Sequence, residues 1–195
     1  MQTARILIAL SLAAAGAIPA SARAQQGPSG RPPAEITQDI LKLGAACRES
    51  GGKPGRSPGM IQIADLTGDG IVDYVLDLNT YNCEGGSPAP GAGQKGGSGQ
   101  NGAAIAIYIG LPAGGARKVF DAVAFSAKVR GAPRQRVWLD LQGVDCGQQN
   151  AASLSMAAQL ACSRPLNWSP ASGAFVYAPL REAQPYGPRP RGLAA

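Results

Sequence analysis

The sequence predicts an α+β, β-dominated domain in which an antiparallel sheet is accompanied by one N-terminal helix and stapled by disulfides. Several short segments alternate apolar and polar residues with a period of two and are separated by glycine and proline, which is typical of antiparallel strands with one buried face. One segment has helical periodicity instead. The 195 residues include four cysteines, and an even number of cysteines in an exported chain indicates disulfides.

The first 24 residues predict export. Arg5 precedes an apolar run at 6–18, and the Ala-Arg-Ala segment at 22–24 has the small residues of a cleavage site, which together form the pattern of a secretory signal peptide. The run is shorter than the ~20 residues that a membrane helix needs, so we expect no transmembrane segment. We expect residues 1–24 to be removed, although cleavage before Arg23 also fits, and the mature protein to be periplasmic or secreted.

The helix is expected directly after a linker. Residues 25–33 are rich in glycine, proline and serine, which predicts a disordered linker. From residue 34 onward, apolar residues recur at the spacing of one helix face, and two glycines at 51 and 52 provide its end. The predicted buried face consists of Ile36, Ile40, Leu43 and Cys47.

Strand patterns follow the helix. They lie at 60–64, 73–78, 104–109, 119–125, 136–141 and 174–177. The segment 151–160 fits either a helix or a strand. Residues 84–102 are rich in glycine and predict a flexible insertion, and residues 184–195 are rich in proline and arginine and predict a disordered tail. A single β-rich domain is therefore expected at 34–183.

The cysteines predict two disulfides. Four cysteines allow three connectivities, and we favour Cys47–Cys83 and Cys146–Cys162 because each pair flanks one predicted structural unit. A four-cysteine zinc site is disfavoured because the chain lacks the C-x-x-C pairs that such sites use.

Charge and composition narrow the function classes. The chain has a formal net charge of +6 and no histidine, which excludes Ser-His-Asp and Cys-His catalysis and histidine-bound zinc. Carboxylate pairs, Ser/Lys sites and metal–carboxylate sites remain. The basic balance permits weak contact with anionic polymers of the cell envelope, and the envelope or extracellular partner itself is left open. Without a basic helix or an interleaved aromatic surface we expect no nucleic-acid binding, and we expect a monomer.

One segment carries a ligand pattern for a metal. Residues 65–73 have the pattern D-x-T-x-D-G-x-x-D, in which the residues at positions 1, 3, 5, 7 and 9 offer oxygens to Ca²⁺ and the glycine at position 6 permits a sharp turn. Strand-like flanks exclude an EF-hand. The alternative is a tight hairpin whose aspartates accept hydrogen bonds from backbone amides, and a catalytic aspartate cluster is disfavoured. The predicted ligands are Asp65, Thr67, Asp69, the Ile71 carbonyl and Asp73.

The segment 60–109 resembles a single FG-GAP hairpin of integrin-type propeller blades, whose loop has the pattern D-x-N-G-D-G-x-x-D. The resemblance implies a calcium loop between two strands. Thr67 replaces the usual Asn or Asp, and one blade cannot close a propeller. The whole chain also resembles small exported bacterial proteins of unknown function that have one such hairpin and a C-terminal cysteine pair before a tryptophan, which implies no activity.

The sequence therefore favours an exported non-catalytic structural or binding module with a weak calcium site. One alternative is a cell-envelope inhibitor or ligand-binding protein, and another is a carboxylate-based hydrolase. Trp138 and Trp168 are candidates for stacking on sugars, although packing in the core or on a sheet face is the better prediction for both.

Overall fold

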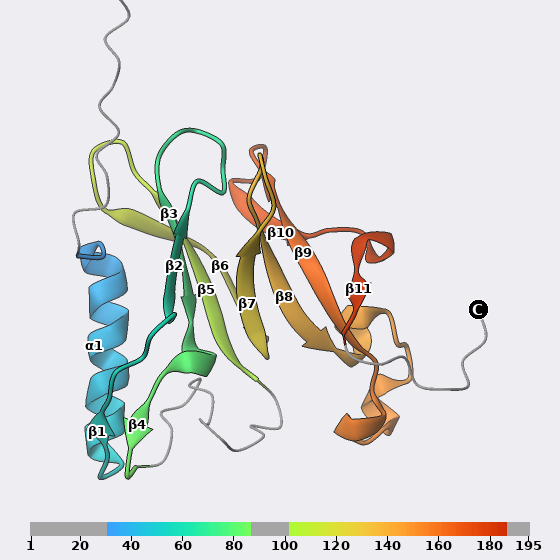
Figure 1. The fold of residues 1–195 in the computed structure, drawn as a ribbon, viewed down its shortest axis with the longest axis horizontal. Helices are drawn as coiled ribbons and strands as arrows, with labels where there is room; N and C mark the ends of the chain where they lie inside the picture. Colours follow the sequence, from blue (N-terminus) through green and yellow to red (C-terminus); the bar gives the residue numbers. More distant parts are fainter. Residues whose placement is uncertain (1–30, 87–101, 187–195) are drawn as a thin grey trace, which may run out of the picture.

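The computed structural model describes residues 31–86 and 102–186. In these ranges one α-helix and the two larger of three antiparallel sheets form three layers, with the helix on one face of the first sheet and the second sheet against its other face (Figure 1). This confirms the predicted α+β, β-dominated class. The signal segment 1–24, residues 25–30 of the linker, most of the glycine-rich insertion and residues 187–195 of the tail lie outside the described residues.

Helix α1 (Ala34–Glu49) has the predicted apolar face. Ile36 and Cys47 are fully buried, and Ile40 and Leu43 pack against the same cluster. The helix starts directly after Pro33, whose carbonyl accepts the first helical hydrogen bond. This placement follows because proline has no backbone N–H to lose and favours an extended residue before it.

The first sheet consists of β2 (Ile61–Ala64), β3 (Asp73–Asp77), β5 (Ala103–Gly110) and β6 (Ala116–Ala124). Its strand order is β2-β3-β5-β6, and every pairing is antiparallel. A side-chain contact anchors the helix to this sheet, because the Tyr108 hydroxyl on β5 donates to the Asp39 carboxylate on α1 at 2.6 Å.

The second sheet consists of β7 (Ser126–Arg130), β8 (Arg136–Gln142), β9 (Ala161–Ser169) and β10 (Ala174–Tyr177). Its order is β10-β9-β8-β7, and the short β11 (Gln184–Pro185) also pairs with β9. Neither β7 nor β9 was predicted. A proline inside a strand pattern argues against a central strand, and Pro165 occupies the middle of β9.

The main core lies between the two sheets. Val75, Ile105 and Ile107 of the first sheet and Val137 and Leu139 of the second are all fully buried in one cluster. Burial of side chains of this size stabilises the fold by about 1.5–3 kcal/mol each. The fold therefore depends on this interface for its cohesion.

Two polar side chains of the first sheet join it to the second. The Gln62 amide donates to the Ala127 carbonyl at 2.7 Å and accepts from the Val129 amide at 3.0 Å. The Asp77 carboxylate accepts from the Ala127 amide at 2.8 Å. Strand β7 is the edge of its sheet, so these side chains satisfy backbone groups that an edge strand leaves unpaired.

Both disulfides have the predicted pairing. Cys47 on α1 joins Cys83 with a Cα–Cα distance of 5.8 Å, and Cys146 joins Cys162 on β9 with 5.7 Å. Cys83 lies in β4 (Cys83–Glu84), which pairs with β1 (Lys53–Pro54). Disulfides persist in oxidising compartments, so this pairing is consistent with a periplasmic or extracellular protein. No helix in 31–86 and 102–186 is long and apolar enough to cross a bilayer.

Two predicted boundaries differ from the structure, and one ambiguous segment is resolved by it. Gln184 and Pro185 pair with Ser163 and Cys162, so regular structure extends into the predicted tail. Glu84 pairs with Lys53, so the strand extends into the predicted insertion. The ambiguous segment 151–160 contains two short 3-10 helices, η3 (Ala151–Ser153) and η4 (Met156–Ala158). In the first two cases a distant partner strand overrides a local turn-like composition.

Candidate functional site

The 65–73 loop connects β2 and β3 and is closed by the pairing of Ala64 with Asp73. Asp73 is fully buried. Its Oδ2 accepts hydrogen bonds from the amides of Leu66 at 2.8 Å and Thr67 at 3.0 Å, and its Oδ1 accepts from the Gly110 amide at 3.0 Å. Asp73 therefore ties both the loop and the end of β5 to the start of β3.

Burial has the largest effect on the pKa of Asp73. Desolvation raises the pKa of this carboxyl above its usual value, and the nearby Asp69 carboxylate raises it further. The amides of Gly110, Leu66 and Thr67 act in the opposite direction but do not outweigh burial. An ionised Asp73 consequently carries a free-energy cost that a nearby cation would reduce.

Asp65 and Asp69 lie on the outer side of the loop. The Asp65 carboxylate accepts from the amides of Gly68 at 2.7 Å and Gly70 at 3.0 Å. Asp69 Oδ1 accepts from the amide of the partly buried Ile71 at 2.8 Å. Both glycines have positive φ, near +80°, which other residues adopt only at a cost. The loop thus has the aspartate-to-amide hydrogen bonds of a tight turn.

Thr67 has no such partner. Its Oγ1 is buried and forms no hydrogen bond with any described residue. A buried hydroxyl without a partner is costly, and Thr67 occupies position 3 of the ligand pattern. An oxygen-binding cation beside the loop would satisfy it, so this observation fits calcium.

The carboxylates themselves are turned toward amides. In the described parts of the chain, no three His, Cys, Asp or Glu side chains are grouped so that they could hold a metal ion. Asp65 and Asp69 use some of their lone pairs on the loop amides, whereas Asp73 is directed into the fold. The arrangement can act as a hydrogen-bonded turn as it stands.

Gly110 contributes to the loop although the sequence did not single it out. A Cβ on Gly110 would clash with the Val72 carbonyl oxygen and lie 2.7 Å from Ile71 Cγ2. The end of β5 can therefore approach the loop only without a side chain, which lets the Gly110 amide reach Asp73. The sequence signal for this close approach was a glycine at the end of an apolar strand.

A second polar cluster lies on the outer face of the second sheet. Asp140 is buried and accepts from the hydroxyls of Ser126 and Ser163 and from Lys128 Nζ at 3.1 Å. Burial opposes ionisation of Asp140, but these three donors together hold its pKa below the usual value. Because both hydroxyls donate to an ionised carboxylate, the cluster links β7, β8 and β9 electrostatically.

The two tryptophans have different environments. Trp168 packs against Phe175 with ring centroids 5.1 Å apart, beside the main core. Trp138 lies on the outer face of β8 and is partly exposed, since the flanking Val137 and Leu139 point into the core. Both rings are partly exposed, but only Trp138 lies on the face of the sheet that points away from the core.

Comparisons with family models, with curated proteins and with solved structures found no match for this chain.

Proposed function

We propose that this protein is an exported, non-catalytic binding module whose 65–73 loop binds calcium. The observation that carries the calcium assignment is the buried Thr67 Oγ1, which has no partner in the described residues. It lies in a loop that also offers carboxylate oxygens at positions 1, 5 and 9. These are the hard oxygen ligands that calcium prefers.

Lone pairs remain available for the ion. Each oxygen of Asp65 accepts one amide, and Oδ2 of Asp69 accepts none from the described residues. A carboxylate oxygen has two lone pairs, so Asp65 and Asp69 can bind an ion while keeping amide contacts. The Thr67 hydroxyl and the Ile71 carbonyl would be further ligands, and the buried Asp73 carboxylate would contribute negative charge near the ion.

The non-catalytic assignment rests on the described cavity and carboxylates. A cavity of about 250 Å³ lies between α1 and the segment before β2. Its lining includes Ile40, Met60 and Tyr81, with Arg48 as its charged group and no carboxylate. Glycoside hydrolysis by carboxylates needs a pair that flanks the bond to be cleaved, which this lining does not provide.

Thermal melts with calcium test the loop. The mature protein is melted in chelator, in excess calcium and in excess magnesium. With a dissociation constant on the order of 0.1–1 mM, calcium at about ten times that value adds about 1.4 kcal/mol to the free energy of unfolding, which raises Tm by a few degrees. Magnesium should act less because it demands stricter octahedral geometry.

Two variants make the result specific. Asp69→Asn should abolish the calcium-dependent rise in Tm, because it removes a ligand charge at an exposed position. Asp121→Asn, an exposed aspartate on β6, should leave the rise intact. Identical wild-type melts with and without calcium, together with no heat in titration calorimetry, would contradict calcium binding and show that the loop is a hydrogen-bonded turn.

A further inference from the structure

One face of the second sheet combines cations with a partly exposed indole. We call it the basic–aromatic face and define it as Lys128, Arg130, Arg134, Arg136 and Trp138. We infer that this face binds an acidic polysaccharide, with carboxylates at the guanidinium groups and a sugar ring on Trp138. The inference rests on the proposed binding function and assigns its surface and partner.

Strand register places these side chains together. β7 pairs with β8 so that Lys128 lies opposite Trp138 and Arg130 lies opposite Arg136. Successive side chains of a strand alternate between the faces of a sheet, and Val137 points into the core. The four paired side chains therefore share the outer face, and the exposed Arg134 lies in the turn that connects the strands.

The indole is flanked by two guanidinium groups. Arg130 Cζ is 5.9 Å and Arg136 Cζ is 6.0 Å from the Trp138 ring centroid. Arg136 is further held by Asn167 Oδ1 at 2.6 Å and by Glu182 at 2.9 Å. Cation–π contacts and these hydrogen bonds preorganise a flat ring beside planar charged groups.

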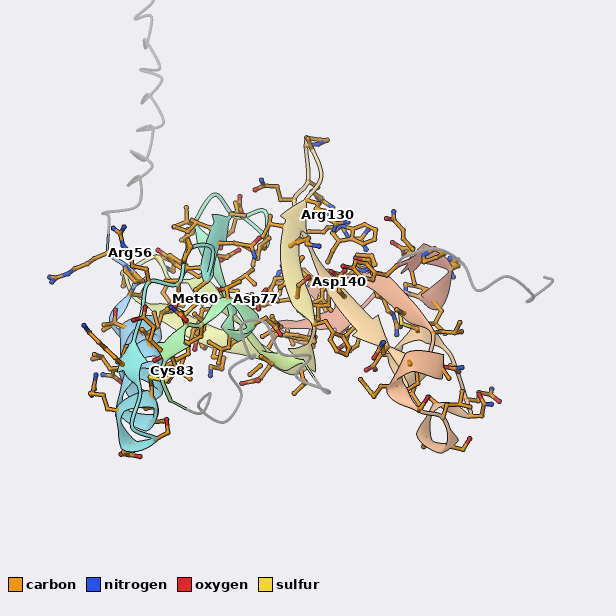
Figure 2. The ribbon with its side chains drawn as sticks, turned by 60° about the horizontal axis from the view of Figure 1, so that its bottom comes forward. Arg56, Met60, Asp77, Cys83, Arg130 and Asp140 are labelled. Atoms are coloured by element: carbon orange, nitrogen blue, oxygen red, sulfur yellow. A yellow bond between two sulfur atoms is a disulfide. The ribbon has the colours of Figure 1, made fainter. Side chains whose placement is uncertain are left out.

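The positive charge of this face is not fully neutralised. Asp140 pairs with Lys128 at 3.1 Å, and Glu182 pairs with Arg136. Arg130 and Arg134 are exposed and have no acidic partner in the described ranges. In Figure 2, Arg130 lies near the tip of the β7–β8 hairpin, well apart from Arg56 near the helix. Two free arginines thus favour an anionic partner at this hairpin.

The chemistry of the face favours an acidic polysaccharide among anionic partners. Arginine forks match carboxylates in two parallel hydrogen bonds, and a flat aromatic ring offers apolar contact to the face of a sugar. The hairpin turn at 131–135 has no large apolar side chain to enter a bilayer. The disulfides fit an oxidising compartment such as the periplasm or the cell exterior.

The test uses polygalacturonate oligomers as the probe, with neutral dextran for comparison. Binding to the full mature chain is measured by calorimetry and tryptophan fluorescence, in chelator so that calcium cannot bridge protein and polymer. We expect saturable binding of polygalacturonate that weakens with added salt, and none of dextran. The double variant Arg130→Gln/Arg134→Gln should lower the affinity about tenfold.

A charge-matched control makes the site specific. Lys53→Gln/Arg56→Gln removes the same charge from exposed positions near the helix and should change the affinity by less than about twofold. Trp138→Phe should remove most of the fluorescence change while the melt stays close to wild type, because the indole lies outside the core.

Several results would overturn the inference. Absence of polygalacturonate binding would do so, as would equal loss in both double variants. Binding of DNA, or of vesicles of phosphatidylglycerol and phosphatidylcholine, with the same arginine dependence but no polygalacturonate binding would replace the partner class. If calcium leaves the melt unchanged while polygalacturonate binds at this face, the loop proposal fails and this inference stands.

Discussion

Removal of the Asp73 carboxylate tests whether this residue organises the hairpin from within the fold. In Asp73→Ala, the amides of Leu66, Thr67 and Gly110 lose their acceptor. An unsatisfied buried donor costs about 1–3 kcal/mol. We take the lower value because the loop is open to water on one side, so three donors give a loss of about 3 kcal/mol in the free energy of unfolding.

That loss corresponds to a fall in Tm of about 6–12 °C for a domain of this size. The assay is urea unfolding and thermal melting in chelator, which removes any contribution from calcium. Asp69→Ala serves as the control because its carboxylate is exposed and accepts a single amide, so it should cost less than about 1 kcal/mol. A melt of Asp73→Ala within about 2 °C of wild type, or an equal loss in the control, would refute the reasoning.

The same site predicts a pH dependence. The pKa of Asp73 is raised in the folded state, so the folded protein takes up a proton at higher pH than the unfolded chain. As pH falls through the raised folded pKa toward the unfolded one, stability should increase relative to Asp73→Asn, which does not titrate there. A constant difference between the two proteins across this window would contradict a buried, ionised Asp73.

Two further predictions concern the rest of the fold. Replacing Cys47 and Cys83 together by serine should lower the free energy of unfolding by about 4 kcal/mol in the chain-entropy model, because the disulfide closes a 36-residue loop; unchanged urea midpoints would contradict this. Asp140→Asn should cost about 1–3 kcal/mol at neutral pH. Because the folded pKa of Asp140 is lowered, the benefit of wild type should be present above the unfolded pKa and disappear as pH falls through the folded one, which acid titrations of both proteins would measure.

Local patterns of the sequence were sufficient for several elements. The spacing of Ile36 and Cys47 predicted the buried face of α1, and strand patterns predicted the four strands of the first sheet and β8 and β10 of the second. Both disulfide pairs were predicted, because each closes a single local unit. These features depend on residues close in the sequence, where periodicity and spacing carry the information.

Other features depend on contacts between distant residues. Strand β9 forms despite Pro165 because β8 and β10 lie on either side of it. The 65–73 motif could be identified from the sequence, but its calcium binding remains a prediction. The hydrogen bond from the Gly110 amide to Asp73 could not be foreseen, because it joins residues 37 positions apart. Likewise, alternation sets which residues share a face with Trp138, whereas only the packing of the first sheet decides which face becomes the core and leaves this indole outside.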